Sequence, residues 1–402
     1  MADFKAMHVI EALRSGVPSR TVGAYFSEAR PAMLNKIRSK LEETRDTGIS
    51  SGMIFRGSYG EGKTHMLNTV FSIASEEKMA VSYVSLGKET PLDKLHVLYS
   101  RLMANTYLPG KEQPGFRTLL EEMTSGSGPA GELLAYAATE LETNKIYHVL
   151  KAMWGTQDEE EKALLLQDLE GEFLSNAAVK KSFRRATGKP AQFNVNFSKT
   201  KHCMDYFAFM SSLFRKTGLK GWVILFDEAE LIGRMGKKAR AKSYRNMQEF
   251  LQPAGRLEST FSLFAFSSSF TEDVIDKKHE FENADAIFSD DASALKAVKT
   301  SLNAVINSPE LASLTKDEIL QVLESIQEFH AWAYDWHPEL SPETIYANTE
   351  AGGYLLRTKI RAAIELLDQL YQYGEAGKIK IKELGKESFE EDTTPDLFDE
   401  EI

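Results

Sequence analysis

Residues 57–64 read Gly-Ser-Tyr-Gly-Glu-Gly-Lys-Thr and match the pattern G-x-x-x-x-G-K-T. Glycines let a backbone adopt conformations in which successive N–H groups point inward around a polyphosphate. The Lys63 side chain can reach the β- and γ-phosphates of a nucleotide, and the Thr64 hydroxyl can bind Mg²⁺. The pattern therefore predicts a loop that binds a nucleoside triphosphate through Gly57, Ser58, Tyr59, Gly60, Glu61, Gly62, Lys63, Thr64 and His65.

The sequence on both sides of this loop suits such a role. Residues 51–56 contain the apolar run Met53-Ile54-Phe55, which predicts a strand, and residues 65–74 have the pattern of a helix. The N-terminus of that helix would face the phosphates. A plain glycine-rich turn is the alternative, and the flanking strand and helix disfavour it.

A second motif, which is acidic, predicts the other half of the site. Residues 222–226 are five consecutive apolar residues, as in a fully buried parallel strand, and Asp227 and Glu228 follow at its carboxyl end, where ligands bind in open parallel sheets. Asp227 would hold Mg²⁺ through its water shell, and Glu228 would orient and polarise the attacking water. A strand that simply ends in a solvated turn is the alternative.

Two further strands are predicted at residues 80–86 and 261–267. The second ends in Ser267-Ser268-Ser269, which would place a hydroxyl beside the γ-phosphate and the water. We take Ser267 as the candidate sensor, although the sequence does not decide among the three serines. A plain serine-rich turn is equally compatible with each of them.

The order of these elements predicts an α/β fold, a P-loop NTPase with a parallel sheet flanked by helices. Five segments are expected along the chain. They are an N-terminal part of the ATPase core (1–104), a mostly helical insertion (105–217), a C-terminal part of the core (218–300), a helical lid (301–385) and an acidic, disordered tail (386–402).

Hydrolysis of a γ-phosphate also needs a cation that stabilises charge in the transition state. Arg357 follows Gly352-Gly353 at the start of the last long helix and could move toward the phosphates with the lid. Arg240 and Arg245 lie one helix beyond the acidic strand and could project into a neighbouring subunit's site. An ordinary surface salt bridge is the alternative for each arginine.

The net charge of −11 is unevenly distributed. Residues 387–402 carry eight acids and no base, which leaves −3 for the rest of the chain. Two basic clusters stand out, and each could contact a phosphate backbone or be only the solvated face of a helix. They are Lys180, Lys181, Arg184, Arg185 and Lys189, and then Arg234, Lys237, Lys238, Arg240, Lys242 and Arg245.

The composition also bounds the compartment. Cys203 is the only cysteine, which excludes a disulfide framework and a cysteine-rich metal site. The N-terminus has no secretory pattern, and no apolar run approaches the ~18 residues that span a bilayer. We therefore expect a soluble, cytoplasmic protein.

Four stretches resemble the ATP-binding proteins of BREX-type phage-defence systems. They are residues 8–20 (HVIEALRSGVPSR), 56–65 (RGSYGEGKTH), 82–91 with SYVSL and ETP, and 226–230 (FDEAE). The resemblance implies an AAA+-like ATPase that uses ATP and Mg²⁺, forms a homo-oligomer and acts on double- or single-stranded DNA beside a helicase, methyltransferase or nuclease.

The opening segment is similar to the family's N-terminal signature, which in AAA+ relatives lies near the adenine. By this resemblance Val9, Arg14, Val17 and Arg20 are candidate neighbours of the base or phosphates, and a helix cap with a turn is the alternative. Residues 285–292 lack the arginine that such ATPases often carry there. There is also little room for a winged-helix domain after the lid, so DNA contact would come from the body, a ring pore or a partner. A nucleotide-dependent switch that controls a partner without binding DNA is the competing function.

Overall fold

The computed structural model describes residues 3–15, 22–23, 30–123, 128–350 and 355–376, together with residues 379 and 389. Its strands form a five-stranded sheet in the spatial order β1-β5-β4-β2-β3. The first four run parallel, and β3 is antiparallel to β2. The strands are β1 (Ser51–Gly57), β2 (Ala80–Ser85), β3 (Thr106–Tyr107), β4 (Trp222–Asp227) and β5 (Thr260–Ser267). This mostly parallel sheet confirms the prediction of an α/β fold.

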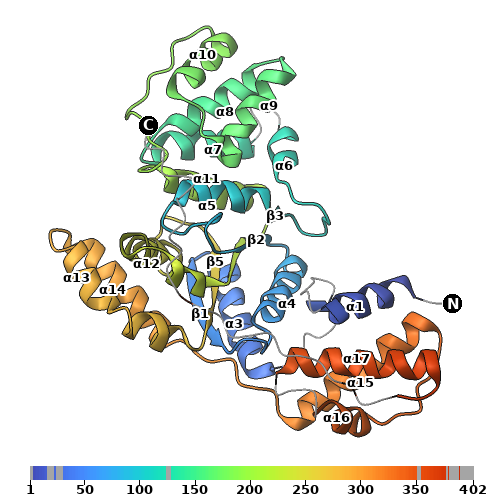
Figure 1. Cartoon of the computed structure of the whole chain (residues 1–402). Helices are drawn as coiled ribbons and strands as arrows, with labels where there is room; N and C mark the ends of the chain where they lie inside the picture. Colours follow the sequence, from blue (N-terminus) through green and yellow to red (C-terminus); the bar gives the residue numbers. More distant parts are fainter. Residues whose placement is uncertain are drawn as a thin grey trace.

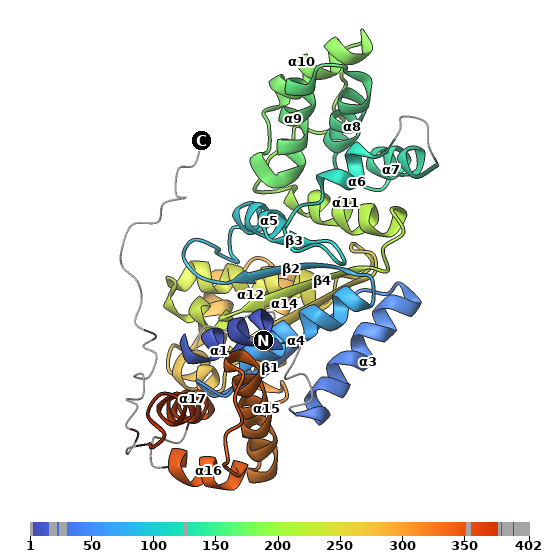
Figure 2. The same cartoon turned by 90° about the vertical axis from the view of Figure 1, so that its right-hand side faces the viewer.

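Helices cover both faces of the sheet, which explains why every residue of its central strands β4 and β5 is buried (Figures 1 and 2). In β4, Val223 and Leu225 enter the core on one face, and Ile224 and Phe226 enter the core on the other. The first face is covered by α3 (Pro31–Thr47) and α4 (Lys63–Glu76). The second is covered by α5 (Leu95–Ala104), α11 (Cys203–Lys216), α12 (Lys237–Leu251) and α14 (Ala292–Ile306), with α13 (Glu280–Ile287) beside α12 and α14.

The outer edge of β1 is covered by a short segment of chain. Arg56 donates its backbone N–H to Pro309 O at 2.9 Å, and its carbonyl accepts from Leu311 N at 2.6 Å. Leu311 is buried in the same core as α3 and α4. The segment therefore closes this edge of the sheet domain, which we define as β1–β5 with α3–α5 and α11–α14.

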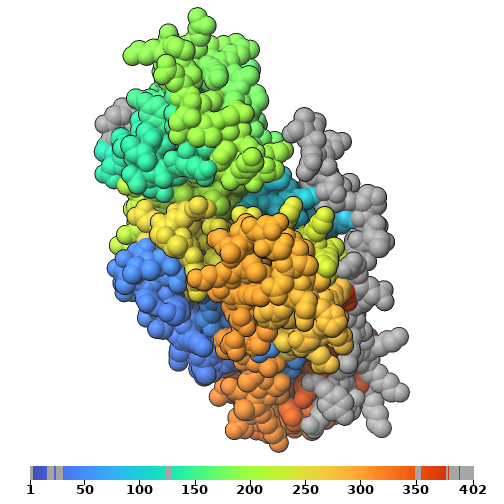
Figure 3. Space-filling model, turned by 90° about the vertical axis from the view of Figure 1, so that its left-hand side faces the viewer, coloured from blue at the N-terminus to red at the C-terminus, as the bar shows by residue number. Residues whose placement is uncertain are grey.

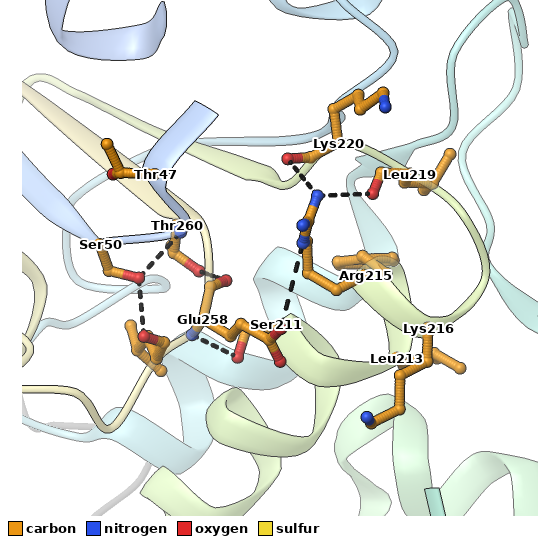
Figure 4. Close-up of polar contacts among 12 residues, drawn as sticks. Thr47, Ser50, Ser211, Leu213, Arg215, Lys216, Leu219, Lys220, Glu258 and Thr260 are labelled. Carbon is orange, nitrogen blue, oxygen red and sulfur yellow. Dashed lines mark hydrogen bonds and ion pairs between the residues drawn. The ribbon is translucent and has the colours of Figure 1, made fainter. Parts of the chain in front are cut away.

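Polar contacts fix the sheet at the amino ends of its strands (Figure 4). The Ser50 hydroxyl donates to Leu257 O at 2.7 Å and accepts from Thr260 N at 2.9 Å. The end of α11 is tied to the same region, because Arg215 donates to Lys220 O at 3.1 Å. These contacts occupy the amino ends, and the opposite, carboxyl ends carry the candidate site.

The first helix of the chain packs with the last ones. α1 (Phe4–Ser15), α15 (Lys316–Tyr334), α16 (Pro342–Glu350) and α17 (Leu356–Tyr373) share one core, and we call them the lid bundle. Arg14 donates to Asp368 at 2.8 Å, and His330 Nε2 lies 3.0 Å from the same carboxylate. These contacts hold the pKa of Asp368 below its ordinary value, although burial opposes them. The predicted core segment 1–104 thus contributes its first helix to the lid.

Most of the predicted insertion, residues 105–217, rises from the sheet domain as a helical projection (Figures 1 and 3), whereas β3 and α11 at its two ends belong to the sheet domain. After β3 it contains α6 (Arg117–Glu121), α7 (Gly128–Thr139), α8 (Lys145–Gly155), α9 (Glu159–Gln167), η1 (Asp168–Glu172), α10 (Asn176–Thr187) and α11. The hydrophobic core of the insertion is continuous with the core on the face of the sheet that α5, α11, α12 and α14 cover. The predicted boundary at residue 300 falls inside α14, which packs against α12. Among the described helices, none is both long and apolar enough to cross a bilayer.

A buried ion pair lies inside the insertion. Lys145 Nζ donates to Asp168 Oδ1 at 2.8 Å, and the Tyr206 hydroxyl donates to Asp168 Oδ2 at 2.6 Å. The ammonium also lies 4.1 Å from the centre of the Phe197 ring. Burial lowers the pKa of Lys145, and Asp168 opposes this shift. The carboxylate therefore favours the charged form of the buried ammonium.

We expect Asp168→Asn to destabilise the protein by about 3 kcal/mol or more, because it leaves a buried ammonium without its counter-charge. The measurement is the midpoint of thermal or urea unfolding. Arg185→Gln is the control, since it breaks a pair in which the arginine side chain is 59% exposed, and its effect should be about 1 kcal/mol or less. Equal midpoints for the two variants would contradict the role of the buried pair.

Candidate functional site

The Gly57–Thr64 loop joins the carboxyl end of β1 to the start of α4. Two of its glycines have the left-handed backbone that other residues disfavour, with φ of 77° at Gly60 and 92° at Gly62. Gly62 is also the residue before the first turn of α4, where the helix begins at Lys63. The N–H groups of this first turn have no acceptor within the helix, so the loop and helix end form a site suited to an anion.

Lys63 lies folded back along the loop. Its Nζ donates to Gly57 O at 3.1 Å and forms an ion pair with Glu230 Oε1 at 3.4 Å. The Glu230 side chain is 2% exposed. An incoming phosphate would therefore compete with a buried carboxylate for the lysine.

Asp227 and Glu228 stand at the carboxyl end of β4 and differ in their surroundings. Asp227 is buried, and its two carboxylate oxygens accept from the Tyr83 hydroxyl at 2.6 Å and from Glu228 N at 2.9 Å. Glu228 is exposed and has a left-handed backbone with φ of 51°. Such strain in a non-glycine residue costs about 1–3 kcal/mol and is typical of functional positions. The Asp227 carboxylate is thus fixed by two hydrogen bonds, whereas the Glu228 side chain is exposed.

Ser267 is brought to this edge by the register of the sheet. β5 lies between β1 and β4, and Ser267 pairs with Gly57. The Ser267 hydroxyl lies 3.2 Å from that of Ser269, and Ser268 N donates to Gly57 O at 3.2 Å. The three predicted serines therefore lie behind the loop, and the contacts do not single out one of them as a sensor.

A cavity of about 250 Å³ between the sheet domain and the lid bundle brings the loop together with Asp227 and Glu228. Ser267, Ser268 and Ser269 are not among the residues that line it. Its polar floor consists of the loop with Thr64, His65, Asp227, Glu228 and Glu230. Its other wall is apolar and is formed by α1, α15, α17 and the segment before α15, with Leu13, Leu314, Val322, Ile326, Leu356 and Ile360. A polar floor under an apolar wall suits a ligand that has a charged end and a flat apolar end.

Arg357 lines the same cavity from the first turn of α17. Its guanidinium donates to the Tyr59 hydroxyl at 3.2 Å and lies 5.6 Å from the centre of that ring. The lid arginine is therefore in contact with the loop, and its catalytic role stays a prediction. Gly352-Gly353, from which movement was predicted, lies outside the described residues.

The comparison with protein families gives a match over residues 3–126 and 134–383, which is nearly the whole chain. The matching model describes the BREX system ATP-binding protein BrxC/D. The chain belongs to this family. The resemblance seen in the sequence is thereby confirmed. A comparison with curated proteins gave no match.

The described part of the predicted N-terminal signature, residues 8–15, reaches the cavity, and it includes two of the four expected residues, Val9 and Arg14. Ala12 and Leu13 line the cavity wall, whereas Val9 is buried in the core of the lid bundle. Arg14 pairs with Asp368. Val17 and Arg20 lie outside the described residues, as does the predicted acidic tail apart from Phe389.

The two arginines of α12 are placed differently from each other. Arg240 is 2% exposed, and its Nε donates to Glu280 Oε1 at 2.8 Å. Burial raises the pKa of Glu280, and Arg240 opposes this shift. The buried pair corrects the expectation for Arg240, because its guanidinium cannot reach a neighbouring subunit. Arg245 is exposed on the same helix.

Sequence reasoning missed Arg30 and Glu230. Arg30 precedes α3 with a left-handed backbone (φ 65°), and its buried guanidinium donates to Glu61 O, to Glu61 Oε2 at 2.9 Å and to Ala312 O at 2.8 Å. Burial lowers its pKa, and Glu61 opposes this shift. Pro31 marks the helix start, but nothing in the sequence indicates that Arg30 holds the loop. Glu230 lies two residues beyond the acidic pair, so the acidic motif could have indicated it.

The oxygen atoms at the cavity could supply only part of the coordination shell of Mg²⁺. Thr64 and Asp227 both line it, and no group of three or more His, Cys, Asp or Glu side chains within the described ranges is arranged to hold a metal. Mg²⁺ typically takes one or two protein oxygens, with phosphate oxygens and waters completing its shell. The residues present are compatible with that mode of binding.

Proposed function

We propose that this protein binds ATP together with Mg²⁺ and hydrolyses it as an AAA+-like ATPase of a BREX defence complex. The observation that carries the proposal is the cavity in which the Gly57–Thr64 loop meets Asp227 and Glu228. The family's description as an ATP-binding protein supports the choice of nucleotide.

Binding would divide the nucleotide between the two walls of the cavity. The phosphates would accept hydrogen bonds from the loop N–H groups, and Lys63 would exchange Glu230 for a phosphate oxygen. The adenine would lie against the apolar wall, where Leu13 and Leu356 offer flat contact. In this mode of binding the γ-phosphate would lie on the side of Glu228.

Hydrolysis would need little covalent chemistry from the protein. Glu228 would accept a hydrogen bond from a water and take its proton as the oxygen attacks the γ-phosphorus. The bond from the γ-phosphorus to the bridging oxygen would break, and ADP and phosphate would leave. Arg357, already beside Tyr59, would stabilise the added negative charge from the lid side.

Thr64 and Asp227 would hold Mg²⁺, which supplies charge neutralisation to the β- and γ-phosphates when bound. Excess EDTA should therefore reduce phosphate release about 100-fold or more. It should leave the melting temperature of the nucleotide-free protein unchanged, since no metal-binding cluster supports the fold within the described residues. Phosphate release that persists in EDTA would contradict the proposal.

We further propose that the protein forms a homo-oligomer and acts on DNA beside a helicase, methyltransferase or nuclease of its system. The exposed Arg245 supports an interfacial role, because it is not committed to a buried pair as Arg240 is. Family membership supports partners within the defence system.

A nucleotide-dependent switch that signals without DNA is the second candidate function. The contacts of Arg30 favour it, because they join Glu61 of the loop to Ala312, just before the lid bundle. A change at the loop on nucleotide binding would thereby reach the lid directly. Measured affinity for DNA separates the two candidates.

A further inference from the structure

One stretch of the insertion has a charge opposite to that of the whole chain. Residues 173–204 contain seven basic residues and no acid, whereas the chain carries a net charge of −11. All seven are exposed, and they are Lys180, Lys181, Arg184, Arg185, Lys189, Lys199 and Lys201. We call residues 176–202, which hold all seven, the basic strap. An exposed surface of this kind attracts anions.

The helix within the basic strap points its charges outward. Val179 and Phe183 are buried on the inner face of α10. Lys180 and Arg184 are separated by four positions, and so are Lys181 and Arg185, so each pair projects from one side of the helix about 6 Å apart along its axis. α10 lies at the far end of the insertion from the sheet (Figures 1 and 2). Its charges are therefore accessible to a large partner.

The rest of the basic strap is held in place although it has no regular secondary structure. Asn144 and Asn194 exchange hydrogen bonds at 3.0 and 3.1 Å, and His148 Nε2 lies 3.0 Å from Gln192 O. The Phe197 ring is fixed under the Lys145 ammonium. The surface is therefore preorganised, which lowers the entropic cost of binding.

The charges of the basic strap are largely uncompensated. Among the described residues, Arg185 is the only one of the seven with an ion pair, to Glu161 at 2.9 Å. At the base of the insertion, His96 of α5 has its pKa lowered to about 4, first by burial and then by Lys199 and Lys94. Lys199 of the basic strap thus lies close enough to α5 of the sheet domain to act on His96.

We propose that the basic strap binds the phosphate backbone of double-stranded DNA. Duplex DNA carries about one negative charge per 1.7 Å of axis, which matches a row of exposed cations. A single strand would need exposed aromatic side chains for stacking. Phe193 and Phe197 instead pack inward against His148 and Tyr206. The strap therefore suits backbone contact that does not depend on base sequence.

This inference rests on the proposed function only in taking DNA as the partner. The test compares the wild-type chain with Lys180→Gln/Lys181→Gln/Arg184→Gln in fluorescence anisotropy on a labelled 30-base-pair duplex. Affinity is measured from 50 to 200 mM salt. The matched control is Lys36→Gln/Arg38→Gln/Lys111→Gln, which removes the same side-chain types from exposed positions outside the strap.

Each lost phosphate contact should lower the slope of log K against log salt by about 0.9. The slope for the strap variant should therefore be about 2.7 smaller than that for the wild type. Between 50 and 200 mM salt, the factor by which duplex affinity falls should then be about 40 times smaller for the variant than for the wild type. The control should keep the wild-type slope. ATP affinity, measured separately, should be the same for all three proteins.

Three outcomes would overturn the inference. They are a wild-type protein that does not bind the duplex, a strap variant with the wild-type slope, and a control that falls as far as the strap variant. If the basic strap binds an acidic protein instead of DNA, one of the first two outcomes is expected. A wild-type protein that binds the duplex but does not bind ATP would contradict the proposed function and would still support the inference about the basic strap.

Discussion

Lys63→Ala is expected to weaken ATP binding about 100-fold or more, because Lys63 is the only lysine or arginine among residues 57–65 that could reach the phosphates. Charge-assisted hydrogen bonds to phosphate are among the strongest that a protein makes. Isothermal titration of the Mg²⁺-ATP complex measures the effect directly. Hydrolysis should be lost with binding.

The control for this variant is Glu230→Gln. It keeps the size of the side chain and leaves Lys63 in place, but it removes the carboxylate that lies 3.4 Å from the ammonium. We expect ATP affinity equal to or higher than that of the wild type, since the phosphate no longer competes with a charge. Wild-type affinity in Lys63→Ala would place the nucleotide elsewhere.

Glu228→Gln is expected to retain ATP and lose hydrolysis by about 100-fold to 1000-fold. The amide has the same size as the carboxylate but cannot accept the proton of the attacking water. Binding should persist, because Asp227, Lys63 and the loop are unchanged. Phosphate release under single-turnover conditions, together with titration of ATP, measures the two effects separately.

Glu122→Gln serves as the control, since Glu122 is exposed in the insertion and is not among the residues that line the cavity. It should bind and hydrolyse ATP as the wild type does. If Glu228→Gln releases phosphate at the wild-type rate, another group activates the water.

The elements that carry the site could be predicted from the sequence because their signals are local. The apolar runs of β4 and β5 mark strands covered on both faces, and the glycine pattern marks the loop. The two residues of β3 are too few to give such a signal. The pairing of Ser267 with Gly57 follows from the order of strands in the sheet, which no local pattern encodes.

The features that could not be predicted from the sequence depend on contacts between distant parts of the chain. Arg14 and Asp368 meet across the lid bundle, so the packing of α1 could not be read from either segment. Arg240 has the pattern of an exposed helix cation, yet Glu280 of α13 covers it. Arg30 reaches Ala312 in the same way. In each case the tertiary partner, and not the local sequence, decides the environment of the arginine.

The segment that closes the edge of β1 limits how the lid bundle can move. Pro309 and Leu311 are hydrogen-bonded to β1, and Ala312 is held by Arg30. Thr315 already caps α15 through a reciprocal contact with Glu318. On this connection, only Ser313 and Leu314 remain as a hinge. Any movement of the bundle at this connection would have to turn on these two residues, and one of them, Leu314, also lines the cavity.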